Sequence, residues 1–537
     1  MNLPVNLFTW IIAALPIITL LILMVKFQWG AYKAAPIGLV IALISALTVY
    51  KSNIFLVFIE SLKGAWSALT ILIVVWTAIL LYEVVDEAKA FKVFRQGMQE
   101  FAPNELIQII ILGWVFVSFL QGITGFGVPV AVGAPLLVGM GVSPLWAVFI
   151  PLIGHTWANT FGTLAVAWDA LILQTDLNSN PELLLRTALW ATFFIWIWNL
   201  ISGVAICWFY GKREALKKGL PAVLIISLIH GGGQLVLSQI NSTLAAFVPS
   251  TLALLVALLM GKTKRYGSPW KIDKSLIMDR TKHIEEAEDF PKDMSMNQAF
   301  LPYYVLTFIT LFILLIPQVK KFFGQVSIGF SFPEVSTRYG YVNEAVESFL
   351  PFFPFTHAGT FLALSSLVGY LYYRKNNWIK SGGGKKVIRL SFEKTIPSGI
   401  AVLGFIIMSQ IMSGSGQTVV LAQGISLILG KGYTLLAPVV GMLGAFMTSS
   451  NMASNILFGK FQLTTAQILN LDPAPLIGAQ TAGGAIGGTI APGNIILGAT
   501  TTGILGQEGE ILKKILPLSL SGVFLIGIIL FISLVIA

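Results

Sequence analysis

The chain has 537 residues, of which 56% are hydrophobic and only 11% are charged. Soluble domains carry about 25% charged residues, so the composition excludes a water-soluble globular protein. The net charge of +10 would suit nucleic-acid binding, but the basic residues gather in short loops between apolar runs. Such clusters mark the cytoplasmic side of a membrane protein. The composition therefore predicts a polytopic membrane protein that binds no nucleic acid.

Apolar runs of membrane-spanning length recur along the chain, since roughly 20 residues cover the hydrocarbon thickness. They lie near residues 8–25, 34–50, 65–82, 106–120, 145–168, 187–210, 243–260, 301–319, 349–373, 398–412 and 515–537. Together with interrupted segments they predict 12 to 14 membrane elements in an all-α fold. No basic residue precedes the first run, whereas Lys26 and Lys33 follow it. We therefore expect a multi-pass protein of the plasma membrane with its N-terminus outside.

The longest hydrophilic stretch, near residues 261–296, mixes charges of both signs and contains few apolar residues. Because it offers no core of its own, we expect a cytoplasmic linker at 261–299 between a first membrane half, 1–260, and a second, 300–537. A polar insertion at 320–347 is expected to be an outer loop with some local order. Both halves contain scaffold runs, an interrupted segment and then a Gly-rich helix, which favours two repeats. The distribution of basic residues favours opposite orientations for them.

An interrupted segment in the first half reads FLQGITGFGVPVAVGAPLLVGMG, at residues 119–141. Gly and Pro break a helix at this density, which a membrane tolerates only where protein or a watery cavity surrounds the backbone. Interrupted segments in both halves indicate a transporter binding site near the middle of the membrane. Glycines let backbone N–H groups approach a ligand, and helix ends that meet here would attract an anion; the alternative is close helix packing. The candidate binding residues are Gln121, Gly122, Thr124, Gly125 and Gly127.

The corresponding segment of the second half reads MTSSNMASNILFGKFQ, at residues 447–462, and QTAGGAIGGTIAPGN follows at 480–494. Hydroxyl and amide groups at this density inside a membrane need partners. A carboxylate substrate, water or a bound cation could supply them, and the alternative is a polar cap between helices. The lysine of this segment either faces an anionic substrate or reaches the membrane interface. The candidate binding residues are Ser449, Ser450, Asn451, Ser454, Asn455 and Lys460.

Two titratable residues are candidates for proton coupling. His155 lies in the run PLIGHTWANTFG, and its alternative role is that of a hydrogen-bonded core histidine. Asp169 is the acid placed furthest inside a membrane run, although water could reach it near the outer end of that run. The single cysteine, Cys207, excludes an internal disulfide and a cysteine-based metal site. Since the chain also lacks a GxxxxGK[ST] loop, we expect no ATP hydrolysis, no cofactor and no metal.

Three short motifs follow one another along the chain: FLQGITGFGVP at 119–129, SNILFG at 454–459 and AGGAIGGTIAP at 482–492. They are similar to signatures of the L-lactate permease family, F-[LI]-E-G-x-x-G-F-G-x-P, S-N-x-L-F-G and A-G-G-A-I-G-x-x-I-[AS]-P. The resemblance covers most of the membrane portion and implies transport of lactate and glycolate with protons. Resemblance to the wider ion-transporter superfamily implies re-entrant hairpins near 119–141 and 447–462 on a mobile transport domain. The chain departs from the family where Gln121 replaces the usual Glu and Met452 a common Thr.

The sequence thus predicts a secondary active transporter, not an enzyme, that imports L-lactate, glycolate or D-lactate together with protons. Because Gln121 cannot titrate, sodium is the alternative coupling ion, and a di- or tricarboxylate is the alternative substrate. A channel with re-entrant loops is a rival of another class, but the long chain in two halves argues against it. A membrane enzyme would need converging His, Asp and Glu residues, which four scattered His do not offer. The expected partners are the organic anion, the co-transported cation and the lipid bilayer.

Overall fold

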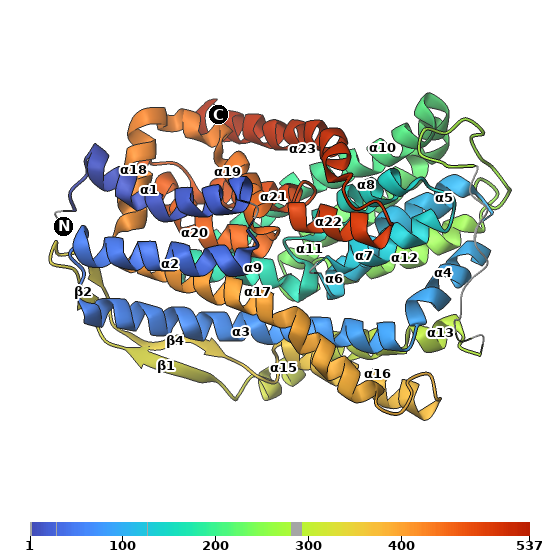
Figure 1. Cartoon of the computed structure of the whole chain (residues 1–537), viewed down its shortest axis with the longest axis horizontal. Helices are drawn as coiled ribbons and strands as arrows, with labels where there is room; N and C mark the ends of the chain where they lie inside the picture. The colour runs from blue at the N-terminus through green and yellow to red at the C-terminus, as the bar shows by residue number, and fades with distance from the viewer. Residues whose placement is uncertain are drawn as a thin grey trace.

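Long helices lie side by side along the longest axis of the molecule (Figure 1). The structure is a computed structural model that describes residues 3–27, 29–101, 103–125, 127–280, 291 and 293–536. In this part of the chain, nine helical segments are long and apolar enough to cross a membrane, or ten if the bent pair Leu301–Leu315 and Pro317–Phe323 forms one span. Shorter apolar helices lie between them. The structure therefore confirms the predicted all-α polytopic membrane fold.

The first half of the chain is helical throughout its described residues. Its helices are α1 (Leu7–Leu21), α2 (Ala31–Thr48), α3 (Ile54–Glu87), α4 (Ala90–Phe101), α5 (Glu105–Ile110), α6 (Val117–Ile123), α7 (Val128–Val138), α8 (Pro144–His155), α9 (Gly162–Thr175), α10 (Pro181–Ser227), α11 (Gly233–Ser238) and α12 (Phe247–Gly261). A π-helical turn, Ile111–Phe116, joins α5 to α6. Polar side chains set several helix starts: Asn53 accepts a hydrogen bond from the backbone of Leu56 at 2.6 Å and so caps α3.

The second half adds four short strands to its helices. The helices are α13 (Met296–Ala299), α14 (Leu301–Leu315), α15 (Pro317–Phe323), α16 (Ala358–Lys375), α17 (Gly383–Gly414), α18 (Gln417–Leu429), α19 (Ala437–Thr448), α20 (Asn451–Ile468), α21 (Pro473–Gly487), α22 (Pro492–Thr501) and α23 (Glu508–Phe531). The strands are β1 (Ile328–Phe332), β2 (Val335–Ser336), β3 (Val342–Asn343) and β4 (Val346–Phe352). Strands β1 and β4 pair antiparallel, as do β2 and β3.

Helix α10 is broken at Gly211 and Lys212, whose φ angles are −162° and 51°. Beyond the break the chain folds back on itself. The close contact between Gly219 and Cys207 shows this, since a Cβ on Gly219 would lie 2.6 Å from Sγ of Cys207. Two helices therefore lie side by side where the apolar pattern predicts only one run, near 187–210. The returning helix escapes a hydropathy count because Lys, Pro, His and Gly residues interrupt its apolar surface.

Glycines bring the principal helices into close contact, as is typical of helix packing in membranes. Helix α17 lies against α3, where a Cβ on Gly64 would be 2.9 Å from Cα of Ile407. Helix α21 lies against α19, where a Cβ on Gly483 would be 2.0 Å from the carbonyl oxygen of Pro438. Any larger residue at these glycines would force the helices apart. The Gly-rich segment at 480–494 thus serves packing along α21.

The beginning of the predicted linker packs against the first half. The carbonyl of Trp270 accepts from the backbone of Glu105 at 3.0 Å, and that of Ile277 accepts from Ser143 at 2.8 Å. Arg280 forms an ion pair with Glu105 at 2.6 Å, and this pairing raises the pKa of the guanidinium above its usual value. The segment that contains α5, α6 and α7 therefore begins and ends at the same stretch of chain. Residues 281–290 of the linker lie outside the described residues.

The polar insertion forms a β-structure that covers the end of α3 at the left of Figure 1. Nε1 of Trp66 on α3 donates to the carbonyl of Leu350 at 3.1 Å. Beneath the strands, Lys63 and Glu60 form a buried ion pair at 2.8 Å, and Nζ of Lys63 lies 5.8 Å from the ring centre of Phe332. The strands and their aromatic side chains thus shield two charges from lipid and water.

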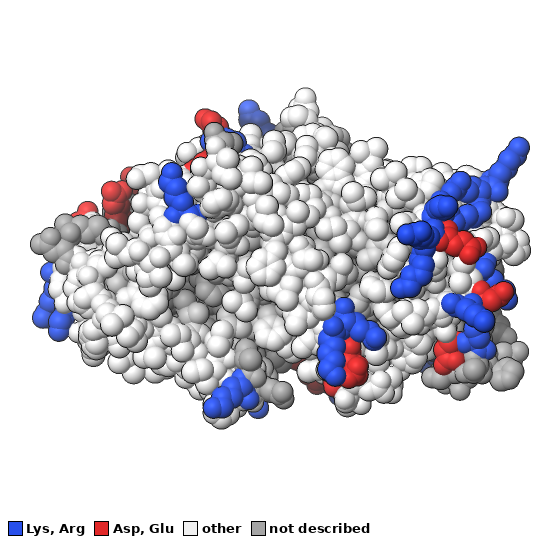
Figure 2. Space-filling view, turned by 90° about the horizontal axis from the view of Figure 1, so that it is seen from above, with Lys and Arg blue, Asp and Glu red and all other residues white. Residues whose placement is uncertain are grey.

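Charged side chains are unevenly distributed over the surface. Most of the face shown in Figure 2 carries none, and the visible Lys, Arg, Asp and Glu gather toward its rims. Many large apolar side chains are exposed among the described residues, such as Phe55 on α3, Leu252 on α12 and Phe308 on α14. An exposed apolar surface of this extent fits a protein embedded in a bilayer.

Candidate functional site

Four interruptions of the helices meet around one small cavity. They lie at 124–127 between α6 and α7, at 156–161 between α8 and α9, at 449–450 between α19 and α20, and at 488–491 between α21 and α22; Phe126 is outside the described residues. The cavity has a volume of about 70 Å³. The described residues that line it are Gln121, Gly127, His155, Asn159, Thr163, Val166, Ala167, Ser449, Ser450, Asn451, Met452, Gly488 and Asn494.

Two glycines shape the first interruption, because both adopt left-handed backbone angles that residues with side chains disfavour. Gly125 has a φ of 59° and Gly127 a φ of 82°. A Cβ on Gly125 would lie 2.1 Å from Oγ1 of Thr163, and a Cβ on Gly127 would lie 2.5 Å from Cδ2 of Leu497. The first interruption therefore contacts α9 and α22 directly, and only glycine fits at either position.

The second interruption ends in a reversal of the backbone. Thr163, Leu164 and Ala165 have φ angles of 50°, 53° and 73°, a region that residues with a Cβ adopt rarely and at a cost in free energy. The reversal brings Thr163, Val166 and Ala167 to the cavity. Backbone strain of this kind is typical of functional sites.

Two asparagines at the start of α20 are held by surrounding hydroxyl and carbonyl groups. Nδ2 of Asn451 donates to Oγ1 of Thr160 at 3.1 Å and to Oγ1 of Thr481 at 3.4 Å. Nδ2 of Asn455 donates to Oγ1 of Thr481 and to the carbonyl of Ala167, both at 2.9 Å. Oδ1 of each asparagine is buried and has no hydrogen-bond partner among the described residues. Buried polar atoms are usually paired; Oδ1 of Asn451 is directed at α21, where a Cβ on Gly484 would lie 2.1 Å from it.

Helices α7, α20 and α22 begin at the cavity, because residues of their caps or first turns line it. Ser450 caps α20 by accepting from the backbone of Ala453 at 3.3 Å, and Oγ of Ser449 accepts from the backbone of Gly493 at 3.0 Å. The N–H groups of a helix start carry partial positive charge. The described lining residues include no Lys, Arg, Asp or Glu. The starts of α7, α20 and α22 therefore offer partial positive charge to a small anion, whereas the ends of α6, α8, α19 and α21, which also reach the cavity, carry partial negative charge.

His155 is the titratable side chain among the described lining residues. Its Nδ1 lies 2.6 Å from the carbonyl oxygen of Pro151. A carbonyl only accepts, so Nδ1 carries the hydrogen and Nε2 of the neutral ring is free to accept a proton. Asp169 lies on an exposed part of α9 and does not line the cavity. Of the two candidates for proton coupling, His155 is therefore the one in contact with the cavity.

Several predicted binding residues contact neighbouring protein groups and do not line the cavity: Gly122, Thr124, Gly125, Ser454, Asn455 and Lys460. The hydroxyl of Thr124 donates to the carbonyl of Leu120 at 2.9 Å, and that of Ser454 donates to the carbonyl of Gly441 at 2.7 Å. A Cβ on Gly122 would be 3.0 Å from the backbone of α12. Contact of these six residues with a substrate stays a prediction.

Other residues of the site carried a weaker sequence signal: Asn159, Thr160, Thr163, Thr481 and Asn494. Four of them lie in segments with notable Gly, Asn or Thr residues, PLIGHTWANTFG and QTAGGAIGGTIAPGN, and Thr163 directly follows the first of these segments. These single polar residues can be recognised as part of the site only from the folded structure, which places each segment opposite the interruptions at 124–127 and 449–450.

Two crevices adjoin the cavity. The first, of about 270 Å³, shares Ser449, Met452 and Asn494 with the cavity. The second, of about 720 Å³, shares Ser449 with the first and reaches the exposed residues Trp29 and Leu505, in the α1–α2 and α22–α23 turns. The cavity and the two crevices thus form a row that extends toward these two turns.

Interrupted membrane helices around a polar cavity are typical of membrane transport proteins. The chain belongs to the L-lactate permease family, whose sequence model matches residues 9–537. This confirms the resemblance drawn from the three motifs. The protein is therefore a multi-pass membrane transporter.

Individual relatives are similar over almost their whole length. The L-lactate permease of Halalkalibacterium halodurans is 26% identical, covering 97% of this chain and 95% of the relative. The glycolate permease GlcA of Escherichia coli is 25% identical, covering 97% and 94%. Among solved structures, the YdaH transporter of Alcanivorax borkumensis matches with 12% identity and a TM-score of 0.43, covering 86% of this chain and 84% of that one.

Proposed function

We propose that the protein is a secondary active transporter that imports a small monocarboxylate together with a proton. L-lactate is the proposed substrate, with glycolate and D-lactate as further substrates. The observation that carries this proposal is the neutral polar cavity at which the helix starts of α7, α20 and α22 meet. Similar relatives named L-lactate permease and glycolate permease support the same substrate class.

The size and charge of the cavity favour a monocarboxylate. A cavity needs about 10–15 Å³ of interior space to hold one water, so a cavity of about 70 Å³ has room for roughly five water-sized groups, which is close to the size of lactate. A di- or tricarboxylate would need more room. It would also need cationic side chains for its further charges, and none occurs among the described lining residues.

Each polar part of a 2-hydroxy acid has a suitable partner in the cavity. The carboxylate would lie at the helix starts, with the hydroxyl groups of Ser450 and Thr163 as additional donors. The substrate hydroxyl would bond to polar side chains that line the cavity, such as Ser449 or Asn159.

The two halves support alternating access through opposed hairpins. The α5–α7 segment begins and ends at the linker, as a re-entrant hairpin from that side would. Helices α19 and α20 pack antiparallel, since Nε2 of Gln462 donates to the carbonyl of Ala437 and Gly444 lies against Ser454. We assign the linker and the basic loops to the cytoplasm of a plasma-membrane protein, with the N-terminus outside. The crevices then open inward, toward the α1–α2 turn.

Proton coupling rests on His155, with Asp169 as the second candidate. Protonation of Nε2 would add a positive charge beside the bound carboxylate, which couples the two bindings. Sodium remains the alternative, because the unpaired Oδ1 atoms of Asn451 and Asn455 offer neutral oxygen ligands. A proton-coupled carrier needs no sodium, so the two cations can be separated by experiment.

Uptake of labelled L-lactate into proteoliposomes tests the proposal. We expect saturable uptake that follows an imposed pH gradient when sodium is absent. Strict dependence on sodium, with no response to the pH gradient, would refute proton coupling. Uptake that does not saturate would indicate a channel, and saturable uptake of a tricarboxylate but not of lactate would refute the substrate class.

A further inference from the structure

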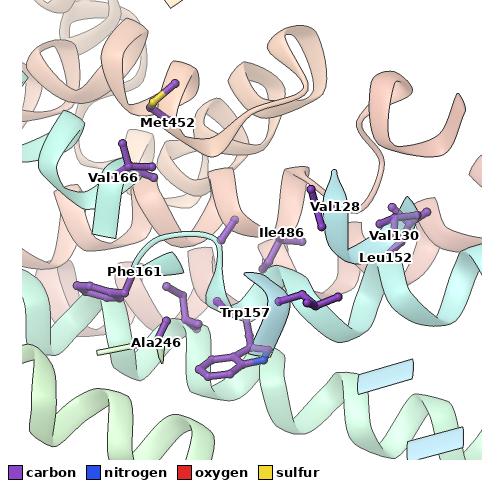
Figure 3. Packing of buried hydrophobic residues seen from close by; sticks show 14 of the residues in the cluster. Val128, Val130, Leu152, Trp157, Phe161, Val166, Ala246, Met452 and Ile486 are labelled. Carbon is purple, nitrogen blue, oxygen red and sulfur yellow. The ribbon is translucent and has the colours of Figure 1, made fainter. Parts of the chain in front are cut away.

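The cavity has two unlike walls. Most of its lining residues are polar, but Val166, Ala167 and Met452 are apolar. Figure 3 shows Val166 on α9 and Met452 on α20 close to each other at the edge of the hydrophobic packing. Both are buried, each with 4% of its surface exposed. Formate and bicarbonate carry no alkyl group, so neither anion would make favourable contacts with these apolar side chains.

We propose that this wall, Val166, Ala167 and Met452, binds the alkyl group at C2 of a 2-hydroxy monocarboxylate and limits its length. The inference rests on the proposed function, which places the carboxylate and the hydroxyl at the polar wall. With the polar end fixed there, the alkyl group points to the apolar wall. The preferred substrate then has a short alkyl group, longer than the hydrogen of glycolate and shorter than a propyl chain.

Val166 and Met452 contribute to this limit in different ways. Valine is branched at Cβ and has little rotamer freedom, and it follows directly on the strained reversal of residues 163–165. Methionine is unbranched and adapts its shape. Met452 also lines the first crevice, whereas Val166 and Ala167 line only the cavity. Val166 is therefore the fixed boundary, and Met452 adjusts as the substrate passes between crevice and cavity.

The expected effects follow from the burial of methylene groups. Each methylene that fits against the wall improves affinity about fourfold, and each one beyond the available space lowers it. Replacement of Val166 by Ala removes two methyl groups and so makes room for about two further carbons. The preference for 2-hydroxybutyrate over lactate should then rise roughly tenfold.

The experiment measures inhibition of labelled L-lactate uptake in proteoliposomes by glycolate, lactate, 2-hydroxybutyrate and 2-hydroxyvalerate. The wild type should favour lactate over glycolate and reject 2-hydroxyvalerate. Val166→Ala should shift the optimum to a longer acid, and Val166→Ile should shift it toward glycolate. The matched control is Val223→Ala, which removes the same two methyl groups from a buried site of α10 and should leave the chain-length profile unchanged.

The outcomes separate this inference from the proposed function. If none of the four acids inhibits uptake of labelled L-lactate by the wild-type protein, the proposed function fails. If the wild type transports lactate but both Val166 variants keep its chain-length profile, only the wall is refuted. Should Val166→Ala fail to fold, two other variants still test the wall. Val166→Ile should restrict the accepted acids to shorter alkyl groups, and Met452→Ala should extend them to longer ones. A change of all four inhibition constants by one common factor would indicate a general structural effect and overturn the inference.

Discussion

The hydroxyl of Thr481 on α21 interacts with side chains of α20 and of the interruption between α8 and α9. Its removal is therefore a sharp test of the site. Oγ1 of Thr481 accepts from Nδ2 of Asn455 at 2.9 Å and from Nδ2 of Asn451 at 3.4 Å. It also lies 3.0 Å from Oγ1 of Thr160. Thr481→Val keeps the shape of the side chain and deletes all three interactions.

The free energy that Thr481→Val loses follows from these distances. Each hydrogen bond contributes about 1 kcal/mol net, and the bond at 3.4 Å contributes least. Both asparagines keep one other acceptor, Thr160 or Ala167, so neither amide is left wholly unpaired. We expect a total loss of about 2 kcal/mol, shared between the stability of the fold and the affinity for substrate. A share of about 1.4 kcal/mol in binding raises the half-saturation concentration tenfold.

The assay is saturable uptake of labelled L-lactate in proteoliposomes, together with thermal unfolding in detergent. Thr481→Ser keeps the hydroxyl and should retain near-normal kinetics. Thr465→Val is the matched control, because this buried hydroxyl donates only within its own helix, to the carbonyl of Phe461 at 2.8 Å. Wild-type half-saturation in Thr481→Val would show that the hydroxyl cluster does not position Asn451, and the reasoning would be refuted.

Three further substitutions test other parts of the cavity. Gly127→Val should abolish uptake without loss of expression, because its Cβ would collide with Leu497, whereas Gly340→Val, at an open position with positive φ, should transport normally. His155→Gln can still bond to its backbone partner but cannot take up a proton. Lactate counterflow should therefore persist, while accumulation driven by a pH gradient is lost. Retained accumulation would exclude His155 as the proton-coupling residue. Gln121→Glu places a carboxyl group at the cavity, and its ionisation should repel the substrate, so uptake should fall more steeply with rising pH than in the wild type; an unchanged pH profile would count against contact with substrate.

The interruptions at 124–127 and 449–450 could be predicted because their residue types are incompatible with a simple spanning helix. Gly125, Gly127 and the Ser-Ser-Asn run break the helical pattern regardless of tertiary structure. The opposing interruptions carry a weaker signal: Thr160 and Thr481 are single hydroxyl residues, which a membrane helix accommodates by bonding to its own backbone. Their contact with Asn451 depends on how α8 and α21 pack, and no local pattern encodes that.

The sequence pattern also could not predict which way each polar group points. The sequence left open whether a substrate, water or a cation would pair with Asn451 and Asn455; in the structure their amide nitrogens bond to protein groups and their carbonyl oxygens have no partner among the described residues. Likewise, the linker has no core of its own in the sequence, and the structure buries Tyr266 and Ile277 against the first half. Both differences arise from long-range contacts, which hydropathy and composition do not record.

The buried pair of Glu60 and Lys63 has a consequence for the biosynthesis of the protein. Helix α3 enters the membrane long before the strands β1 to β4 that cover this pair are synthesised. Because the two charges lie one helical turn apart on the same helix, they can neutralise each other during insertion without any tertiary partner. A single charge at the centre of a membrane helix opposes insertion by about 3 kcal/mol, and the cost is smaller near the helix start, where this pair lies. Nascent α3 therefore carries its own counter-ion before the strands that cover the pair exist.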